Sequence, residues 1–480
     1  MSLQGVLPFV LEFSGQKPVV LEVSAGRLSS DAGLLPIRQF DERLGFTAQL
    51  AAALQDFRDP ELTTHHLLSM LRQRVYGLLA DYEDQNDHDT LRSDPVFKLI
   101  AGRSPEDPQD LASQPTLSRF ENAVQPADLF RLRDVFVEQF IASFPTPPLS
   151  LTFDIDAFDD PTYGQQQLTF FHGFYEQHQY LPIAITCAEN DFVVLAGLRH
   201  GTCAAALGAD DDVRYLVTQL RTVWPDVQLH IRGDSGFGVP AMYAVCEELE
   251  LTYTFGFSLN PRLKRASDAL LSQAVEQYAQ TGVKQRLFTG LWYRADSWNH
   301  ERYVILKAEC QAQGTNRRAV VTNRPGAVLF PAATYDEYVQ RGESENRNKE
   351  LKVGMKADRL SDHRFLANFF RLCLHAAALN LLTRLRRQVA RNPSPESLGI
   401  GDPVPSQALS GRSRKTFFNR RREADPLGEG HPATWRTRLI KVAAEVFVSA
   451  RRIVVRVSAH WPHLPHLADV TRQVLRLEPG

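Results

Sequence analysis

The sequence is poor in cysteine and has no cysteines at metal-binding spacing. Only five occur among its 480 residues, and none of them forms a C-x-x-C pair. Structural zinc sites usually depend on such closely spaced pairs, so we expect no zinc site of that kind. The odd number of cysteines fits a reducing compartment. We therefore expect the protein to be located in the cytoplasm.

Long apolar runs are also missing. No stretch of about 18 apolar residues exists, so the sequence predicts no transmembrane helix. The N-terminus M-S-L-Q-G-V-L-P-F-V lacks the basic start and long apolar stretch of a secretory signal. The loop G-x-x-x-x-G-K-[S/T], which cradles nucleotide phosphates, is absent as well. We therefore expect no dependence on a nucleoside triphosphate.

The charge is unevenly distributed along the chain. The formal net charge is −2, but residues 341–480 hold 26 Lys and Arg against 13 Asp and Glu, a net of +13. Residues 1–340 therefore carry −15. A basic C-terminal third on an acidic chain indicates a surface for a polyanion, although a charge-complementary domain interface would give the same count.

Hydrophobic periodicity divides the chain into successive parts. A hairpin is predicted over residues 5–23, and helices follow as far as about residue 143. Meandering strands and then strand–helix alternation from about residue 150 predict a mixed α/β sheet. A linker rich in Pro, Ser and Gly precedes a basic run and a final helix near Trp435–Ser458. The domains we predict are 1–145 (mainly helical), 146–265 (core, first part), 266–328 (β-rich insertion), 329–392 (core, second part) and 393–480 (basic linker and helical region).

Three acidic positions stand out in the predicted core. Asp154 and Asp156 lie two residues apart on one strand and so face the same side of the sheet. Asp234 ends another strand, in H-I-R-G-D-S-G-F. Glu345 lies on a predicted helix. Carboxylates from two strands and a helix suit hard ions such as Mg²⁺, and two such ions can catalyse phosphodiester cleavage.

The helix that carries Glu345 presents a set of polar residues on one face. At about 100° per residue, Tyr338, Arg341, Glu345 and Lys352 fall at about 0°, −60°, −20° and −40° around the axis. We call these four residues the tetrad. Thr334 and Glu337 form a T-x-x-E pattern, which predicts a capping box at the start of this helix. A face of this composition suits a phosphate backbone and a metal ion, although solvated charged helices are also common.

Taken together, these motifs resemble a known family. D-I-D-A, R-G-D-S-G-F and Y-x₂-R-x₃-E-x₆-K resemble the DDE transposases of bacterial insertion sequences, in the branch with a Y-R-E-K signature. D-D-P-T-Y-G-Q-Q-Q-L-T-F-F-H-G-F-Y, L-S-R-F-E-N and D-P-L-G-E-G are similar to the IS thirteen-eighty group. The resemblance covers nearly the whole chain. It implies an RNase H-like mixed-sheet core with a β-rich insertion, flanked by helical N- and C-terminal regions.

The resemblance also implies functional residues. The catalytic, metal-binding triad falls on Asp156, Asp234 and Glu345, and Asp154 remains an alternative to Asp156 because the family pattern D-(S/T)-T reads D-A-F here. The implied cofactor is a pair of Mg²⁺ or Mn²⁺ ions. The family's base-stacking tryptophan has two candidates, and the basic run adds further positions. The expected DNA-binding residues are Tyr338, Arg341, Lys352, Trp292, Trp298, Arg420, Arg421 and Arg422.

The function implied is cut-and-paste transposition, with a DNA hairpin as intermediate. Its partners would be the terminal inverted repeats and the target, both double-stranded DNA, bound by a homodimer in a bacterial cytoplasm. Two alternatives remain. One is an RNase H-like metal-dependent nuclease without strand transfer, and the other is an inactive DNA-binding relic. Inverted repeats in the DNA that flanks the gene would favour transposition.

Overall fold

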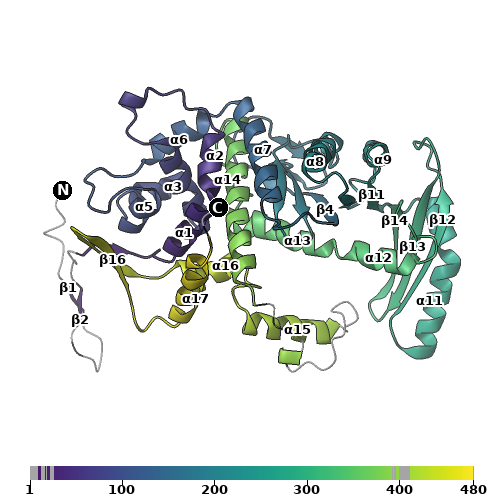
Figure 1. Cartoon of the computed structure of the whole chain (residues 1–480). Coiled ribbons are helices and arrows are strands. Elements are labelled where there is room, and N and C mark those ends of the chain that lie inside the picture. Colours follow the sequence, from purple (N-terminus) through teal and green to yellow (C-terminus); the bar gives the residue numbers. More distant parts are fainter. Residues whose placement is uncertain are drawn as a thin grey trace.

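The computed structural model describes residues 9–11, 17, 19–21, 26–391, 393, 396–398 and 411–478. In Figure 1 the N-terminal helices lie at one end of an elongated molecule and a group of long strands at the other, with the helix α14 (Phe365–Val389) between them. The side chains of Arg412, Arg414 and Lys415 in the basic run lie outside the described residues, as does most of the predicted linker.

The N-terminal part is helical, as the sequence predicts. The predicted hairpin is present as the antiparallel strands β1 (Phe9–Leu11) and β2 (Val19–Leu21). Helix α1 ends at Gly45, whose φ of 62° is a conformation that glycine adopts readily. The helices are α1 (Leu34–Leu44), α2 (Phe46–Ala52), α3 (Leu67–Leu79), α4 (His88–Leu91), α5 (Pro95–Ile100), α6 (Gln114–Asn122) and α7 (Pro126–Ile141), with short 3₁₀ turns at Pro60–Leu62 and Gln85–Asp87.

An eight-stranded mixed sheet forms the centre of the molecule, in the order β12-β13-β14-β11-β10-β4-β8-β9. Strand β4 pairs antiparallel with β8 and parallel with β10, which in turn is parallel to β11. Helices α8 (Ala209–Val223) and α9 (Pro240–Glu248) make the crossovers to β10 and β11, as the predicted strand–helix alternation requires. In chain order, the first five strands of this sheet are β4 (Ser150–Ala157), β8 (Ile183–Cys187), β9 (Val193–Gly197), β10 (Gln228–Gly233) and β11 (Thr252–Phe257).

The β-rich region after β11 extends this sheet. After helices α10 (Pro261–Ala266) and α11 (Asp268–Thr281), three long antiparallel strands follow, and the last of them pairs with β11. The middle strand is buried along nearly its whole length and contains the apolar run Y-V-I-L. The strands are β12 (Gln285–Tyr293), β13 (Arg302–Gln311) and β14 (Gly314–Thr322).

A small three-stranded ribbon leaves the sheet between β4 and β8. Its strands are β5 (Asp160–Pro161), β6 (Phe170–His172) and β7 (Gln177–Tyr180), in the order β5-β7-β6. The strand predicted around Q-L-T-F-F-H-G-F-Y is therefore only the short β6. The rest of that stretch forms turns on either side of β6.

The predicted tetrad helix is broken into three pieces: α12 (Pro331–Val339), α13 (Gly342–Lys349) and a π-helical turn at Glu350–Gly354. The predicted capping box is wrong. Thr334 lies inside α12, where its hydroxyl donates to the Phe330 carbonyl oxygen at 3.1 Å, because Pro331 already starts the helix at its first position. The amides of Gln340 and Arg341 bond to carbonyl groups three residues back, which tightens the turn and ends α12.

The C-terminal part contains a hairpin where the sequence predicts a final helix near Trp435–Ser458, so that prediction is wrong. Strands β15 (Ala444–Ser449) and β16 (Arg452–Val457) are rich in β-branched residues, which favour strands. Strand β15 also pairs with β3 (Leu28–Ser29), close to the start of the chain. The helical segments of this part are α15 (Gly411–Ala424), α16 (Pro432–Trp435), a π-helical turn at Arg436–Ile440 and α17 (Leu464–Leu475), with a 3₁₀ turn at Glu396–Leu398.

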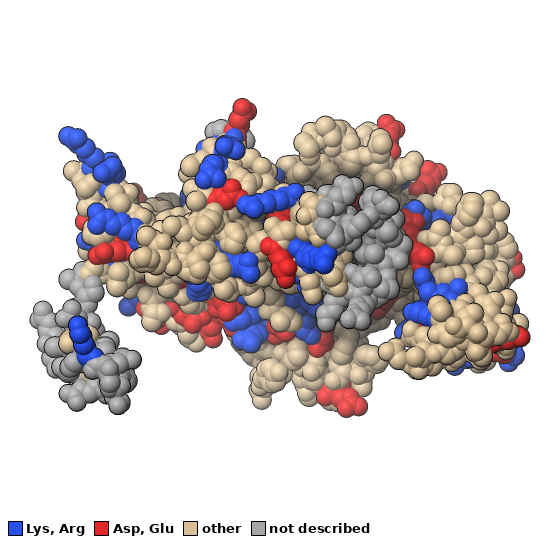
Figure 2. Space-filling model, turned by 90° about the horizontal axis from the view of Figure 1, so that it is seen from below, with Lys and Arg blue, Asp and Glu red and all other residues tan. Residues whose placement is uncertain are grey.

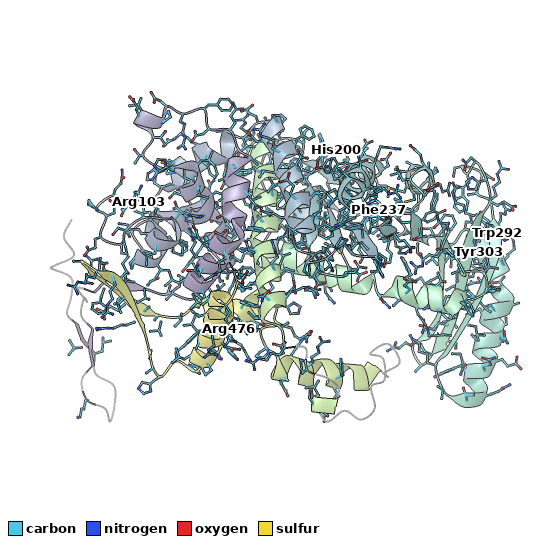
Figure 3. The ribbon with its side chains drawn as sticks, viewed as in Figure 1. Arg103, His200, Phe237, Trp292, Tyr303 and Arg476 are labelled. Carbon is cyan, nitrogen blue, oxygen red and sulfur yellow. The ribbon has the colours of Figure 1, made fainter. Side chains whose placement is uncertain are left out.

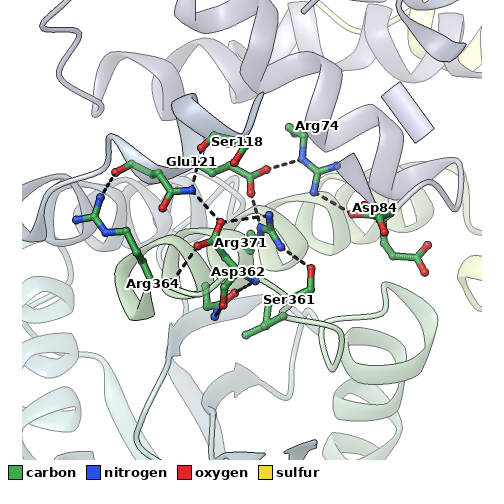
Figure 4. A network of polar contacts seen from close by, with 12 residues as sticks. Arg74, Asp84, Ser118, Glu121, Ser361, Asp362, Arg364 and Arg371 are labelled. Carbon is green, nitrogen blue, oxygen red and sulfur yellow. Dashed lines mark hydrogen bonds and ion pairs between the residues drawn. The ribbon is translucent and has the colours of Figure 1, made fainter. Parts of the chain in front are cut away.

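Helix α14 is the core helix of the molecule. By length and composition it could cross a membrane, with a mean hydropathy of 1.5 over its most apolar window, but 83% of that window is buried inside the fold. It is joined to the N-terminal helices by buried charges (Figure 4). Glu121 of α6, which is 0% exposed, accepts from Arg74 of α3 at 2.7 Å and from Arg371 of α14. One carboxylate therefore neutralises two buried guanidinium groups and connects three helices.

Replacing Glu121 should destabilise the protein strongly. In Glu121→Ala the guanidinium groups of Arg74 and Arg371 lose their shared counter-ion while they stay buried. Removing one partner of a buried ion pair costs about 3–5 kcal/mol of unfolding free energy. Urea unfolding followed by circular dichroism measures this loss. The control is Glu248→Ala, which breaks the exposed pair with Arg214 and should change little; equal stability of the two variants would contradict the assigned role.

Candidate active site

Two of the predicted acids meet where neighbouring parallel strands end. Asp156 lies near the end of β4, and Asp234 follows the last residue of β10. The register pairs Ile155 with Gly233, so the two aspartates come directly after paired positions. Side chains after the carboxyl ends of adjacent parallel strands gather at one edge of the sheet, which is where open α/β sheets commonly bind ligands.

Asp154 is engaged in a buried ion pair. Its two carboxylate oxygens accept from Arg232 Nε and Nη2 at 2.7 and 2.8 Å, and the two residues are directly paired across β4 and β10. Arg232 Nη1 also donates to the carbonyl oxygen of Glu337, near the end of α12, at 2.8 Å. Burial raises the pKa of Asp154, and Arg232 opposes that rise. Asp154 thus fixes α12 against the sheet.

Asp156 has a polar environment of its own. Asn348 Nδ2 donates to its Oδ2 at 2.8 Å, and the Ala157 amide donates to its Oδ1 at 2.9 Å. A guanidinium nitrogen of Arg341 lies 3.7 Å from the same Oδ2. Burial raises the pKa of Asp156 to about 6, with Asp234 adding to the rise and Arg341 opposing it. The carboxylates of Asp156 and Asp234 are therefore close enough to repel each other.

Arg341 joins Glu345 to this carboxylate pair. It lies in the break between α12 and α13, and its Nη2 donates to Glu345 Oε1 at 2.9 Å. Its guanidinium carbon is 5.9 Å from the centroid of the Tyr338 ring. Burial raises the pKa of the Tyr338 hydroxyl, opposed by Arg341 and assisted by Asp234 and Glu345. Four predicted residues, Asp156, Asp234, Tyr338 and Glu345, thus surround Arg341.

Tyr338 is held against the sheet by a close approach to Gly256. A side chain at Gly256 of β11 would begin 2.9 Å from the Tyr338 hydroxyl oxygen and 2.8 Å from the Ser235 amide nitrogen. Only glycine leaves room for this contact. The glycine therefore lets the tyrosine hydroxyl lie beside the residue that follows Asp234.

The fourth tetrad residue points elsewhere. Lys352 lies in the π-helical turn, and its Nζ is 2.5 Å from Asp159 Oδ1. Asp159 follows β4 by two residues and also accepts from Gln177 Nε2 of the ribbon at 3.2 Å. Lys352 therefore connects the tetrad region to the ribbon.

The two tryptophans occupy different environments. Trp298 is 4% exposed and packs against Tyr243, Phe257 and Tyr293, so neither of its faces is open to a DNA base. This position does not fit the base-stacking role predicted from the sequence. Trp292 of β12 is 61% exposed and lies with Tyr303 at the far end of the molecule (Figure 3).

The sheet register separates Trp292 from the carboxylates. Trp292 pairs with Tyr303, and the pairing continues strand by strand until it reaches Arg232 and then Asp154, five steps in all. Directly paired residues share one face, so Trp292 is on the face that carries Asp154 and Asp156. At about 4.8 Å per strand, the five steps amount to about 24 Å.

The basic run forms part of α15. Arg420 Nη1 donates to the Leu398 carbonyl oxygen at 3.2 Å, and Arg421 Nε lies 2.7 Å from Glu429. Arg422 is exposed. Helix α15 lies below α13 in Figure 1, and Arg421 lines a pocket together with Arg347 of α13 and Arg386 of α14. In Figure 2 Lys and Arg are interspersed with Asp and Glu on the described part of the lower face. The contacts of Arg420 and Arg421 named above are thus with Leu398 and Glu429, and not with the carboxylates of Asp156, Asp234 or Glu345.

The donor set fits hard divalent ions. Carboxylate oxygens are the ligands that Mg²⁺ and Mn²⁺ prefer. Among the described residues no three His, Cys, Asp or Glu side chains lie close enough to hold one ion. Arg341 lies between Asp156 and Glu345, and its positive charge pairs with both carboxylates. Burial is the main cause of the raised pKa of Asp156, and the Asp234 carboxylate adds to it.

The chain matches one known family over most of its length. Residues 11–398 match the family described as transposase DDE domain group 1. The chain belongs to this family. No curated protein matches the sequence. DDE transposases cut DNA, so the family supports a transposase function and generally implies a divalent metal.

Some residues of this site were not singled out from the sequence. Asn348 donates to Asp156 and lies three positions after Glu345, so helical spacing could have placed it on the same face. Arg232 lies in R-G-D, two residues before Asp234, and alternates onto the same face of the sheet as Asp154. Asp159 had no local signal, because its partner Lys352 is far away in the chain.

The raised pKa of Asp156 predicts a pH-dependent stability. The folded state binds a proton at Asp156 more tightly than the unfolded state, so wild-type stability falls as the pH rises from about 4 to about 6 and stays lower above that. Asp156→Asn removes this loss. Relative to the wild type, the variant should gain up to about 3 kcal/mol between pH 4 and pH 8. Denaturant unfolding without divalent ions measures the gain.

The control for this experiment is Asp226→Asn, at an exposed position before β10. It removes the same charge from the surface and should gain no stability with rising pH. If the difference in unfolding free energy between Asp156→Asn and the wild type does not change between pH 4 and pH 8, folding does not raise the pKa of Asp156.

Proposed function

We propose that the protein is a DNA transposase that cuts the ends of an insertion sequence and joins them to target DNA in the cytoplasm. The observation that carries this proposal is the meeting of Asp156 and Asp234 at adjacent strand ends, with Glu345 joined to them through Arg341. The strand order β9-β8-β4-β10-β11, with two parallel crossovers, supports an RNase H-like core. Strands β12–β14 would then be its insertion.

Asp156 is the better first acid of the triad. Both oxygens of Asp154 are already bonded to Arg232, and breaking that buried pair would leave a guanidinium without its counter-ion. Asp156 accepts single hydrogen bonds from Asn348 and from the Ala157 amide, and the Asp234 carboxylate lies near it. Asp156, Asp234 and Glu345 would hold two Mg²⁺ or Mn²⁺ ions. When bound, the ions would activate the attacking oxygen and stabilise the leaving 3′-oxygen.

The other side chains would position the DNA. Once metal ions neutralise the carboxylates, the planar guanidinium group of Arg341 would move away from Glu345 and donate hydrogen bonds to phosphate oxygens. Tyr338 would donate its hydroxyl hydrogen to a phosphate near the cut, and Lys352 would supply a point charge. Trp292, with its exposed ring, is the tryptophan that we retain for base stacking.

The reaction is a series of phosphodiester exchanges. Water attacks the phosphate at the element end and frees a 3′-hydroxyl, which then attacks the opposite strand and closes a hairpin. A second water opens the hairpin, and the same 3′-hydroxyl attacks target DNA. Each step exchanges one bond to phosphorus for another, so no nucleotide cofactor is consumed. Because two ends must be joined together, the active form would be a homodimer on DNA, with residues 1–145 binding the ends.

The carboxylates can be tested one at a time. Asp156→Ala, Asp234→Ala and Glu345→Ala should each reduce cleavage by at least about 10³-fold while end binding stays within a few-fold, because the side chains hold the catalytic ions and not the duplex. Duplexes taken from the DNA that flanks the gene serve as substrate, with Mg²⁺ present. Near-normal cleavage by Asp234→Ala would overturn the triad.

The metal and the strand-transfer step have their own controls. Chelation should abolish wild-type cleavage, and Ca²⁺ should support binding without cutting because its coordination is looser. A plasmid target added to the same reaction detects joined products. Cleavage without joining would favour a nuclease, and binding without cleavage would favour an inactive relic.

The basic run is tested by salt dependence. Each phosphate contact contributes about 0.9 to the slope of log K against log salt concentration. Replacing Arg420, Arg421 and Arg422 together with alanine should weaken binding and reduce the slope by up to about 2.7. The matched control replaces Arg451, Arg452 and Arg456, which removes equal charge from the hairpin β15–β16. Equal slopes for the two triple variants would exclude a specific role for the run.

A further inference from the structure

The ribbon between β4 and β8 exposes an unusual number of aromatic rings. We call residues 159–180 the aromatic ribbon. Phe174, at its turn, is 83% exposed, and Tyr175 beside it is 36% exposed. Their rings meet edge to face at 5.0 Å. Exposing such large apolar surface to water is unfavourable, so clustered rings of this kind indicate a binding surface.

The base of the aromatic ribbon is firmly anchored. Gln166 Nε2 donates to the Leu360 carbonyl oxygen at 2.5 Å, and the Phe365 amide donates to Gln167 Oε1 at 3.1 Å. The Tyr180 hydroxyl donates to the Gln167 carbonyl oxygen at 2.7 Å. The ribbon is thus tied to the segment that leads into α14.

The turn of the aromatic ribbon adjoins the candidate active site. Gln177 of β7 is paired with His172 of β6, and it bonds to Asp159, the partner of Lys352. The centroids of the Tyr175 and His172 rings are 5.0 Å apart, so the Tyr175 ring lies on the side of the ribbon that carries His172 and its partner Gln177. Burial raises the pKa of Tyr175, and the carboxylates of Asp159, Asp156 and Asp234 raise it further. The turn therefore shares the electrostatic field of the catalytic carboxylates.

We propose that Phe174 and Tyr175 stack on an unpaired DNA base next to the phosphate that is cut. This inference rests on the proposed function, because it takes the scissile phosphate to bind at Asp156 and Asp234. Asp159, which accepts from Gln177 of the ribbon, follows Asp156 by three residues, so a base attached to that nucleotide would lie close to this turn. Every base has a π-face, so an aromatic pair can hold it without reading its sequence.

The geometry favours a DNA base over a protein partner. The aromatic ribbon is bonded through Gln177 to Asp159, the ion-pair partner of Lys352, and Tyr175 lies within the electrostatic reach of Asp156 and Asp234. The exposed tryptophan of the insertion cannot serve this base within the same protomer, because Trp292 lies about 24 Å from Asp154 along the sheet. The aromatic ribbon thus supplies rings where the reaction separates the two strands.

The test compares two duplexes of the element end, one fully paired and one with a two-base mismatch at the mapped cleavage position. Binding is measured in Asp234→Ala, so no DNA is cut. The mismatched duplex should bind at least about fivefold more tightly, and Phe174→Ala added to this variant should abolish the preference. Phe174→Leu should abolish it as well, because leucine has no ring, whereas Phe174→Trp should keep it.

The matched control is Phe171→Ala, added in the same way. Phe171 is 53% exposed but alternates onto the opposite side of the ribbon, against His178. It should keep the preference for the mismatch. Because Phe174 makes few contacts, its variants should fold normally, which circular dichroism checks.

The outcomes separate this inference from the proposed function. If Asp234→Ala binds neither duplex, the proposed function fails. If it binds DNA and Phe174→Ala keeps the mismatch preference, the role of the aromatic ribbon fails alone. If Phe174→Ala instead weakens self-association in sedimentation while the preference is unchanged, the rings bind a second copy of the chain and the inference is overturned.

Discussion

The buried ion pair between Asp154 and Arg232 is the interaction on which the candidate active site depends. It connects β4 to β10 through both carboxylate oxygens, and Arg232 continues to a carbonyl oxygen near the end of α12. This contact reinforces the backbone pairing of the two strands that carry Asp156 and Asp234. It also holds the end of α12 against the sheet, close to Tyr338 and Arg341. A buried pair of this kind adds little net stability, but its loss would leave a charge unpaired in the core.

The second constraint is the repulsion that the fold creates at the same edge. Asp156 is mostly buried beside Asp234, and the pKa of Asp156 rises to about 6 as a result. Arg341 relieves part of this repulsion from the break between two helices, and it reaches Glu345 from the same position. Without the break between α12 and α13, a continuous helix would place Arg341 at a different position relative to Asp156. The break therefore places the guanidinium group of Arg341 among carboxylates. In the proposed mechanism, divalent metal ions would take over the neutralisation of these carboxylates.

Much of the fold follows from local patterns, and the errors arise where distant contacts decide. The alternation around Leu151, Phe153 and Ile155 predicts β4 because those side chains fill the core. The break at Arg341 was missed, since helical periodicity continues through it and only the 3₁₀-type bonds end α12. The hairpin β15–β16 was missed because β15 pairs with Leu28–Ser29 at the other end of the chain. Local sequence does not distinguish Trp292 from Trp298, because their difference in burial comes from tertiary packing.

The sheet would also set the spacing between the proposed DNA contacts. Hydrogen bonding fixes the strand spacing, so the separation of about 24 Å between Trp292 and Asp154 cannot shorten much without breaking the sheet. At about 3.4 Å per nucleotide along one strand, that separation corresponds to about seven nucleotides. A ring on β12 and a ring on the aromatic ribbon would therefore meet different bases of the same end. In the proposed complex, strands β12–β14 would lengthen the surface that holds DNA, whereas the aromatic ribbon, which is bonded to Asp159, would lie beside the bases that separate at the cut.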